Sequence, residues 1–156
     1  MAELKEGSKA PEVKLLTDTG EELKLSSLKG KNVVLYFYPK SDTPGCTTEA
    51  CGFRDADAKI QKLGAVVLGV SPDPVKAQAK FRSKFELPFT LLADPDHSAA
   101  EAFGVWAEKS MYGRKYMGVA RTTFLIGKDG KIAKIFEKVK PAGHADEVLA
   151  ALQELN

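Results

Sequence analysis

The distribution of apolar residues along the chain predicts alternating strands and helices. Two continuous apolar runs, Asn32–Tyr38 and Ala65–Val70, are rich in β-branched residues, as in strands that are buried on both faces of a sheet. Between them, apolar residues recur at steps of three and four across Pro44–Leu63, which predicts an amphipathic helix. Thr43 can cap this helix and Gly64 can end it, so the helix is expected to lie between them.

Shorter elements are expected before and after this strand–helix–strand unit. Turn residues at Asp18-Thr19-Gly20 and Lys128-Asp129-Gly130 each lie between two extended segments, so each is expected to close a β-hairpin. The segment Trp106–Ala120 has no clear period, so a loop or an irregular insertion is expected there. The other expected elements are hairpin strands at Glu12–Thr17, Glu22–Leu25, Arg121–Ile126 and Ile132–Phe136, a strand at Phe89–Ala93, and helices at Pro74–Phe85, Ala99–Phe103 and Ala145–Leu155.

The order of these elements predicts the fold class. Strands that are joined by helices imply a parallel sheet with helices on both faces. The later hairpin adds antiparallel strands, so the central sheet is expected to be mixed, and an N-terminal hairpin precedes it. We therefore expect an α/β, thioredoxin-like sandwich. The length of 156 residues fits a single domain over residues 1–156.

Composition and charge exclude several classes of protein. The net charge is only +2, which gives no reason to expect a nucleic-acid partner. The longest apolar run, Val33–Tyr38, is far too short to span a membrane. The N-terminal sequence MAELKEGSKAPEV contains acidic residues and no apolar core, unlike a signal or transit peptide. A cytoplasmic protein without a membrane partner is therefore expected.

The two cysteines, Cys46 and Cys51, lie where a buried strand is expected to give way to a helix. Catalytic sites of open α/β sheets lie at the carboxyl ends of strands. With Thr43 as the cap, Cys46 falls in the first helical turn, where unpaired N–H groups and the helix dipole favour an anion. A thiolate is such an anion, and it is the nucleophilic form of cysteine. Because cytosolic disulfides are usually transient, catalytic or sensing, we expect this pair to be chemically active.

The spacing of the pair constrains this chemistry. Residues five apart in an intact helix have Cα atoms about 8.6 Å apart, whereas a disulfide requires at most about 7 Å. A bond between Cys46 and Cys51 therefore requires the first helical turns to unwind. Gly45 and Gly52 flank the pair and are weak helix formers, which lowers the free-energy cost of unwinding.

Other interpretations of the cysteines are less consistent with their positions. An isolated cysteine on an apolar helix face is usually a small core residue, but Cys46 has both a strand end and Cys51 nearby. Two cysteines cannot complete a tetrahedral zinc site without histidines. His97 and His144 are distant in sequence and lack ligand spacing, so no metal is expected, and each is expected at the surface or at a helix start. A Cys-x-x-Cys exchange centre is absent from the sequence.

Several segments resemble a known family. Pro39-x-x-x-Thr43-x-x-Cys46 matches the Pro-x-x-x-Thr-x-x-Cys signature of peroxiredoxins. The run from Gly45 to Cys51 resembles the Q-type subgroup, also called bacterioferritin comigratory protein, in which a second cysteine often lies five residues after the first. Further segments that resemble this subgroup are Phe103-Gly104-Val105-Trp106, Met111-Tyr112-Gly113, Tyr116-Met117-Gly118 and Arg121-Thr122-Thr123-Phe124-Leu125-Ile126. The resemblance covers nearly the whole chain.

The resemblance implies roles for individual residues. Cys46 would be the peroxidatic nucleophile, and its backbone N–H would help to hold the peroxide. Thr43 would offer its hydroxyl to the thiolate and the peroxide, a role that competes with capping for one oxygen. Pro39 would wall the pocket and keep water away. Arg121 would approach Cys46 and stabilise negative charge, although without the resemblance a solvated charge at a strand end would be the preferred interpretation.

Three further expectations concern the surroundings of the site. Gly45 and Glu49 are expected at the substrate-binding site, and Glu49 is expected to orient Arg121. The aromatic residues Phe37, Tyr38, Phe53 and Trp106 are candidates for an apolar collar, with ordinary packing as the alternative.

The resemblance also implies a reaction. The Cys46 thiolate would attack a hydroperoxide and become a sulfenic acid, which Cys51 would convert to an intramolecular disulfide. An external dithiol, thioredoxin above all, would reduce the disulfide, and no metal, haem or flavin would be required. A monomer is expected. The alternatives are a peroxide-sensing relay protein and a thiol–disulfide oxidoreductase.

Overall fold

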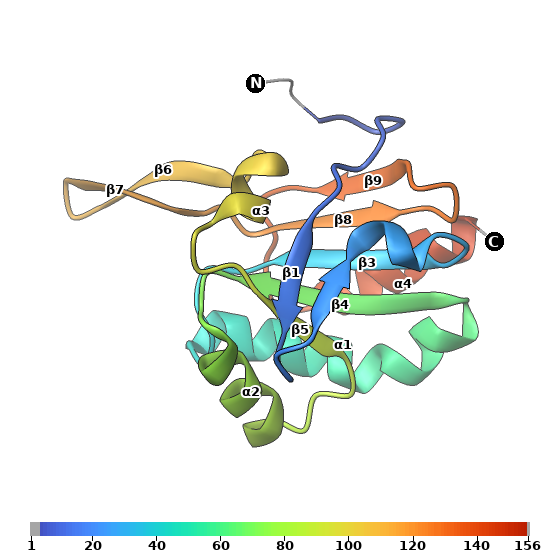
Figure 1. Ribbon diagram of the computed structural model, residues 1–156, viewed down its shortest axis with the longest axis horizontal. Coiled ribbons are helices and arrows are strands. Elements are labelled where there is room, and N and C mark those ends of the chain that lie inside the picture. The colour runs from blue at the N-terminus through green and yellow to red at the C-terminus, as the bar shows by residue number, and fades with distance from the viewer. Residues whose placement is uncertain (1–3, 156) are drawn as a thin grey trace.

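A computed structural model describes residues 4–155, and its main feature is a seven-stranded sheet (Figure 1). Strand order in this sheet is β2-β1-β5-β4-β3-β8-β9, and β6 and β7 form a separate two-stranded sheet. In chain order, the elements are β1 (Lys14–Thr17), β2 (Glu22–Lys24), the 3₁₀ helix η1 (Leu25–Leu28), β3 (Asn32–Phe37), α1 (Pro44–Lys62), β4 (Ala65–Ser71), α2 (Val75–Lys84), β5 (Thr90–Ala93), α3 (Ser98–Ala102), β6 (Trp106–Met111), β7 (Arg114–Val119), β8 (Thr122–Ile126), β9 (Ile132–Phe136) and α4 (His144–Leu155).

The interior strand β3 has one parallel and one antiparallel neighbour. It pairs in parallel with β4 and antiparallel with β8, while β4 pairs in parallel with β5. All six residues of β3 are buried, as its continuous apolar sequence predicts. The N-terminal hairpin of β1 and β2 joins the sheet through β5. The expected mixed sheet with an N-terminal hairpin is therefore confirmed.

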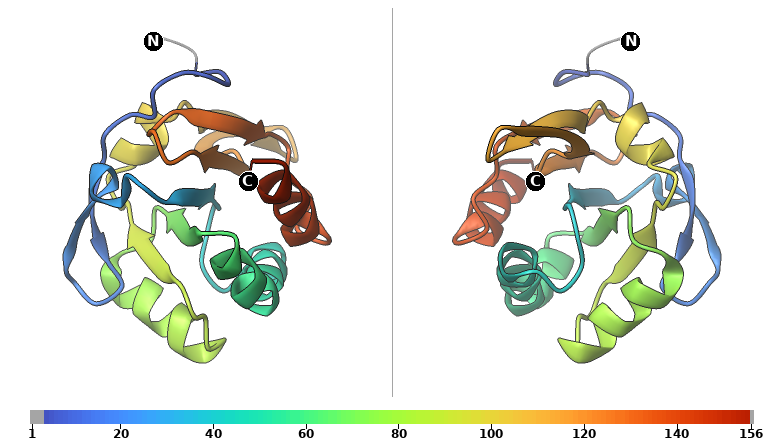
Figure 2. Two further views of the ribbon diagram at one scale, coloured as in Figure 1. Left: turned by 90° about the vertical axis from the view of Figure 1, so that its right-hand side faces the viewer. Right: turned by 90° about the vertical axis from the view of Figure 1, so that its left-hand side faces the viewer.

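Helices cover both faces of the sheet (Figure 2). On one face, α1 and α4 pack side by side, and their apolar residues form one core cluster with Phe81 of α2 and alternate residues of β3. On the other face, α3 and η1 pack with the intervening residues of β3 in a second cluster. The expected two-faced arrangement is confirmed. Within residues 4–155, no helix is both long enough and apolar enough to cross a membrane.

The segment Trp106–Ala120 is a β-hairpin, so the expectation of a loop or irregular insertion is wrong. Strands β6 and β7 pair over six residues, and Tyr112 and Gly113 form the tip with positive φ angles of 53° and 78°. The hairpin extends away from the sheet (Figure 1), and Tyr112 is 99% exposed. Alternation marks a strand only when one of its faces is buried. Because most side chains of β7 are exposed, the pattern is absent from its sequence.

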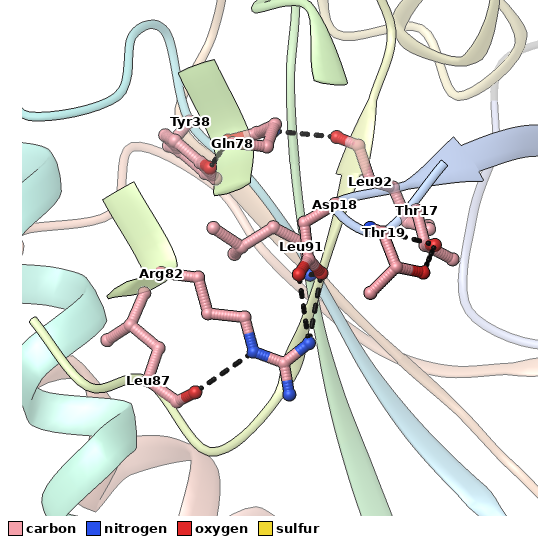
Figure 3. Close-up of polar contacts among 9 residues, drawn as sticks. All are labelled: Thr17, Asp18, Thr19, Tyr38, Gln78, Arg82, Leu87, Leu91 and Leu92. Atoms are coloured by element: carbon pink, nitrogen blue, oxygen red, sulfur yellow. Dashed lines mark hydrogen bonds and ion pairs between the residues drawn. The ribbon is translucent and has the colours of Figure 1, made fainter. Parts of the chain in front are cut away.

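A partly buried ion pair connects the N-terminal hairpin to α2 (Figure 3). Asp18, in the turn after β1, is only 8% exposed, and both of its carboxylate oxygens accept hydrogen bonds from Arg82 Nη1, at 3.0 and 3.1 Å. Asp18 also accepts the backbone N–H of Leu91, and Arg82 donates to the carbonyl of Leu87. These contacts hold α2 against the ends of β1 and β5.

Candidate active site

Cys46 lies in the first turn of α1, just after the turn that follows β3. Thr43 is the N-cap residue and Pro44 begins the helix, as the sequence predicts. The expected side-chain cap is wrong, because Thr43 Oγ1 makes no capping hydrogen bond. It donates instead to the carbonyl of Lys40 at 2.9 Å. Cys46 itself is only 1% exposed and belongs to the core cluster beneath α1. A thiol therefore lies at a helix N-terminus and is largely shielded from water.

Arg121 contacts the sulfur of Cys46. Its Nη2 lies 3.2 Å from Cys46 Sγ, within hydrogen-bond distance for sulfur. This contact follows from the sheet register, because Thr122 pairs with Phe37 at the end of β3, which places the preceding Arg121 beside the start of α1. The structure thus brings together two residues that are 75 positions apart. A guanidinium at this distance stabilises a thiolate electrostatically.

Glu49 holds the other side of the guanidinium. It lies three residues after Cys46, on the same buried face of α1, and its Oε1 accepts from Arg121 Nη1 at 2.6 Å. Burial raises the pKa of Glu49 to about 7, although the Arg121 charge acts in the opposite direction. Burial lowers the pKa of Arg121, but Glu49 and Cys46 outweigh this effect and raise it overall. Arg121 is therefore held as a cation between two acidic groups.

The raised pKa of Glu49 predicts a specific pH dependence of stability. Between its unfolded value of 4.5 and its folded value of about 7, the native state binds more protons than the unfolded state, so stability falls as pH rises. Glu49→Gln removes this titration. From pH 5 to pH 8, the unfolding free energy of the parent should fall by about 2–3 kcal/mol relative to that of the variant, as measured by urea denaturation.

Comparison with the variant is essential because His144 titrates in an overlapping range. Burial lowers the pKa of His144, so its contribution to stability is lost progressively as pH falls from the unfolded value of 6.5 through the lower pKa of the folded state. This contribution is present in both proteins and cancels in the difference. A difference that does not change with pH would show that Glu49 stays ionised in the folded protein.

Gly45 allows the guanidinium to approach the helix. A Cβ atom at this position would lie 3.3 Å from Arg121 Nη2, which is a tight contact, and 3.5 Å from Pro141 Cγ, which is an ordinary van der Waals distance. Pro141, in the segment before α4, therefore borders the site, and no sequence pattern indicates it.

Pro39 is half-buried in the turn between β3 and α1.

Cys51 lies on the same helix as Cys46 and is half-buried. Both cysteines are free thiols, and α1 is continuous from Pro44 to Lys62. Next to Cys51, Gly52 faces α4, where an added Cβ would lie 3.6 Å from Ala145 Cβ. The second thiol cannot reach Cys46 while α1 is intact.

The aromatic residues divide between the two cores. Tyr38 and Phe53 share the core cluster of Cys46, whereas Phe37 packs against Phe103 and Phe124 in the cluster on the opposite face. Trp106 also packs against that opposite cluster. The expected collar around Cys46 is therefore wrong for Phe37, because successive residues of β3 point to opposite faces of the sheet, and for Trp106, because it packs against the opposite core.

The two histidines lie at helix starts, as expected. His97 is the N-cap of α3 and stacks on Trp106 with ring centroids 3.9 Å apart. His144 begins α4 and is completely buried, with Nε2 2.8 Å from Thr123 Oγ1 and its ring packed edge-on against Phe53. Within residues 4–155, no group of three His, Cys, Asp or Glu side chains could hold a metal ion.

Lys109 of β6 is a further charged residue near the site, and the sequence did not indicate it. Its side chain passes over Gly118 of β7, with Cδ 3.3 Å from the position that a Cβ would occupy. Burial and the Arg121 charge lower the pKa of Lys109, while the Cys46 sulfur acts in the opposite direction. The base of the β6–β7 hairpin therefore adds a cation to the electrostatic surroundings of Cys46 and Arg121.

Comparison with known proteins identifies a family for this site. Residues 7–135 match the AhpC/TSA family. The chain is 55% identical over 146 residues to a putative peroxiredoxin bcp from Coxiella burnetii, covering 94% of this chain and 97% of that protein. It is 51% identical over 150 residues to peroxiredoxin Bcp from Bacillus subtilis, covering 96% of each.

Solved structures agree with this result. A crystal structure of a mutant of Xylella fastidiosa PrxQ matches with a TM-score of 0.93 and 35% identity, covering 99% of each chain. Xanthomonas campestris bacterioferritin comigratory protein, which was studied for alkyl peroxide reduction, matches with a TM-score of 0.88 and 42% identity, covering 92% of this chain and 90% of that one. The thioredoxin-like fold expected from the sequence is confirmed.

Proposed function

Because this chain belongs to the AhpC/TSA family, in its peroxiredoxin Q branch, we propose that it is a peroxidase that uses Cys46 to reduce hydrogen peroxide and organic hydroperoxides. The observation that carries this assignment to Cys46 is the 3.2 Å contact between its sulfur and Arg121 Nη2 at the N-terminus of α1. A cation and a helix N-terminus together favour the thiolate that must attack the peroxide.

The first step is attack of the thiolate on the terminal oxygen of ROOH. A sulfur–oxygen bond forms, the O–O bond breaks, and RO⁻ takes a proton from solvent and leaves as water or an alcohol. Cys46 is oxidised to a sulfenic acid. Arg121 stabilises the charge that moves from sulfur to the leaving oxygen, and Glu49 fixes the guanidinium by its 2.6 Å bond. Thr43 and Pro39 border the peroxide in the turn before α1.

The second step joins Cys46 to Cys51. The Cys51 thiol attacks the sulfenic sulfur, a disulfide forms, and water leaves. Because both residues lie on one intact helix, this step requires the first turns of α1 to unwind. A dithiol protein of the thioredoxin type then reduces the disulfide by exchange and becomes oxidised itself. We further propose that residues 1–156 form one domain, that the chain is a monomer, and that it acts in the cytoplasm.

Arg121→Met tests the role of the guanidinium. Methionine keeps an unbranched side chain but is shorter and carries no charge, so the attacking sulfur and the leaving oxygen lose one stabilising donor. The second-order rate constant for peroxide consumption should fall by about 10²–10³-fold. Arg54→Met, on the same helix, is the matched control, because the Arg54 guanidinium is bonded to Asp55 and to the carbonyl of Phe85 instead; it should leave the rate within about twofold of the parent. An Arg121→Met protein with the parent rate would remove Arg121 from the reaction.

A coupled assay tests the function itself. Protein mixed with thioredoxin, thioredoxin reductase, NADPH and peroxide should consume NADPH continuously, in proportion to the peroxide added. A single burst equal to the protein concentration would show a redox sensor, and reduction of insulin without reaction with peroxide would show a thiol–disulfide oxidoreductase. Peptide masses after peroxide treatment should show Cys46 and Cys51 joined within one chain.

A further inference from the structure

A buried side chain of α2 is bonded to the turn that leads into the active site. Gln78 is fully buried. Its Oε1 accepts hydrogen bonds from the hydroxyls of Tyr38 at 2.7 Å and Ser41 at 2.8 Å. Its Nε2 donates to Ser71 Oγ at 2.9 Å and to the carbonyl of Leu92 at 2.7 Å (Figure 3 shows the bonds to Tyr38 and Leu92). The amide thus makes all four of its possible bonds and connects the turn to β4 and β5.

Ser41 is also held through its backbone. Its N–H donates to Asp73 Oδ2 at 2.8 Å, and the same oxygen accepts the Ser71 hydroxyl at 2.6 Å. The next contact along the chain is the ion pair of Asp42 with Lys84. Both of its side chains are exposed, so the pair contributes little to holding the turn in place. The firm attachment of the turn therefore ends at Ser41, before α1 begins.

This attachment lies between the two turn residues that border the peroxide in the proposed function. Pro39 precedes Ser41 by two residues and Thr43 follows it by two. The Thr43 hydroxyl donates to the carbonyl of Lys40 at 2.9 Å, so its place depends on the shape of the same turn. The bonds made by Ser41 thus fix a segment of chain that carries both residues.

The turn is continuous with the helix that must unwind. Movement of Cys46 toward Cys51 pulls on the chain before α1 unless that chain is held elsewhere. Gln78 and Asp73 hold it from α2 and from the segment after β4, and both lie outside the unwinding helix. The rearrangement is then confined to residues after Ser41.

We propose that Gln78 and Asp73 are positioning residues, which keep the turn of residues 39–43 in the shape that receives the peroxide while α1 winds and unwinds. This inference rests on the proposed peroxidase function. It assigns these residues no contact with the reacting atoms. They act through Ser41, whose hydroxyl and N–H they bind.

The test isolates the attack on peroxide by placing every variant in a Cys51→Ser chain, which cannot form the intramolecular disulfide. Ser41→Ala/Asp73→Ala removes both attachments of the turn, and Ser41→Ala alone removes one of them. Arg82→Met is the matched control, because it removes the ion pair that holds α2 to the N-terminal hairpin but leaves both bonds of Ser41. For each chain, we would measure the rate of peroxide consumption, the rate of Cys46 alkylation by iodoacetamide, and the thermal midpoint.

Peroxide consumption should slow by about tenfold in the double variant, and by less in Ser41→Ala, because a displaced turn no longer receives the peroxide correctly. Alkylation depends on the thiolate and on access to the sulfur, and not on the fit of the peroxide, so its rate should not fall by more than about twofold below that of the parent. Arg82→Met should lower the thermal midpoint without slowing peroxide consumption. This combination distinguishes positioning of the turn from a general loss of stability.

Two results for the double variant would overturn the inference. One is a peroxide rate within twofold of its parent, and the other is an equal loss of the peroxide and alkylation rates. A third overturning result is that Arg82→Met slows peroxide consumption as much as the double variant, which would show an effect of stability alone. A parent Cys51→Ser chain that consumes no peroxide at all would instead overturn the proposed function, and this inference with it.

Discussion

Cys46→Ser should reduce peroxide consumption to the rate without enzyme, a loss on the order of 10⁶-fold if removal of this nucleophile acts as it does in other enzymes. Serine keeps the size of the side chain and can still accept a hydrogen bond from Arg121. Its hydroxyl is not ionised at neutral pH, however, and a neutral hydroxyl is a weak nucleophile. Peroxide consumption under single-turnover conditions, without any external reductant, measures the effect directly.

The same substitution at the second cysteine provides the control for this result. Cys51→Ser should still consume one peroxide per chain, because Cys46 and its contact with Arg121 are retained. Circular dichroism and thermal unfolding should show that the Cys46→Ser protein is folded. Activity of Cys46→Ser equal to that of the parent would overturn the assignment of the nucleophile.

The parts of the fold that were predictable from sequence are those with strongly patterned apolar residues. The continuous apolar run of β3 and the three- and four-residue steps of α1 gave both elements nearly to the residue. The strands β6 and β7 were missed because burial on one face, which creates alternation, is lacking in most of β7. Lys109, a neighbour of the site, was missed together with its strand.

The active site was likewise predictable from sequence only in part. The local features around Cys46 follow from a buried strand, a helix-starting proline and a nearby second cysteine, all within one short segment. The contact of Arg121 with Cys46 depends on the pairing of β8 with β3, which no local pattern encodes, so it was expected only from the family resemblance. Gln78 likewise looks like an ordinary helical residue in sequence, because its four partners come from distant segments.

Cys51→Ser should separate the two halves of the reaction. Attack on the first peroxide should proceed at a rate within about twofold of the parent, since Cys51 cannot reach Cys46 while α1 is intact and takes no part in that step. Sustained NADPH consumption with thioredoxin should be lost, because no intramolecular disulfide forms for the dithiol to exchange with. The coupled assay measures the turnover, and single-turnover peroxide consumption measures the attack.

The chemical fate of Cys46 provides the decisive measurement for this variant. Without Cys51, the sulfenic acid persists and reacts with further peroxide, first to the sulfinic and then to the sulfonic acid. Mass spectrometry should therefore show added oxygen on the Cys46 peptide of the variant, whereas the parent should show the disulfide. Full turnover of Cys51→Ser with thioredoxin would mean that the dithiol reduces the sulfenic acid directly. In that case the unwinding of α1 would not be required for the catalytic cycle.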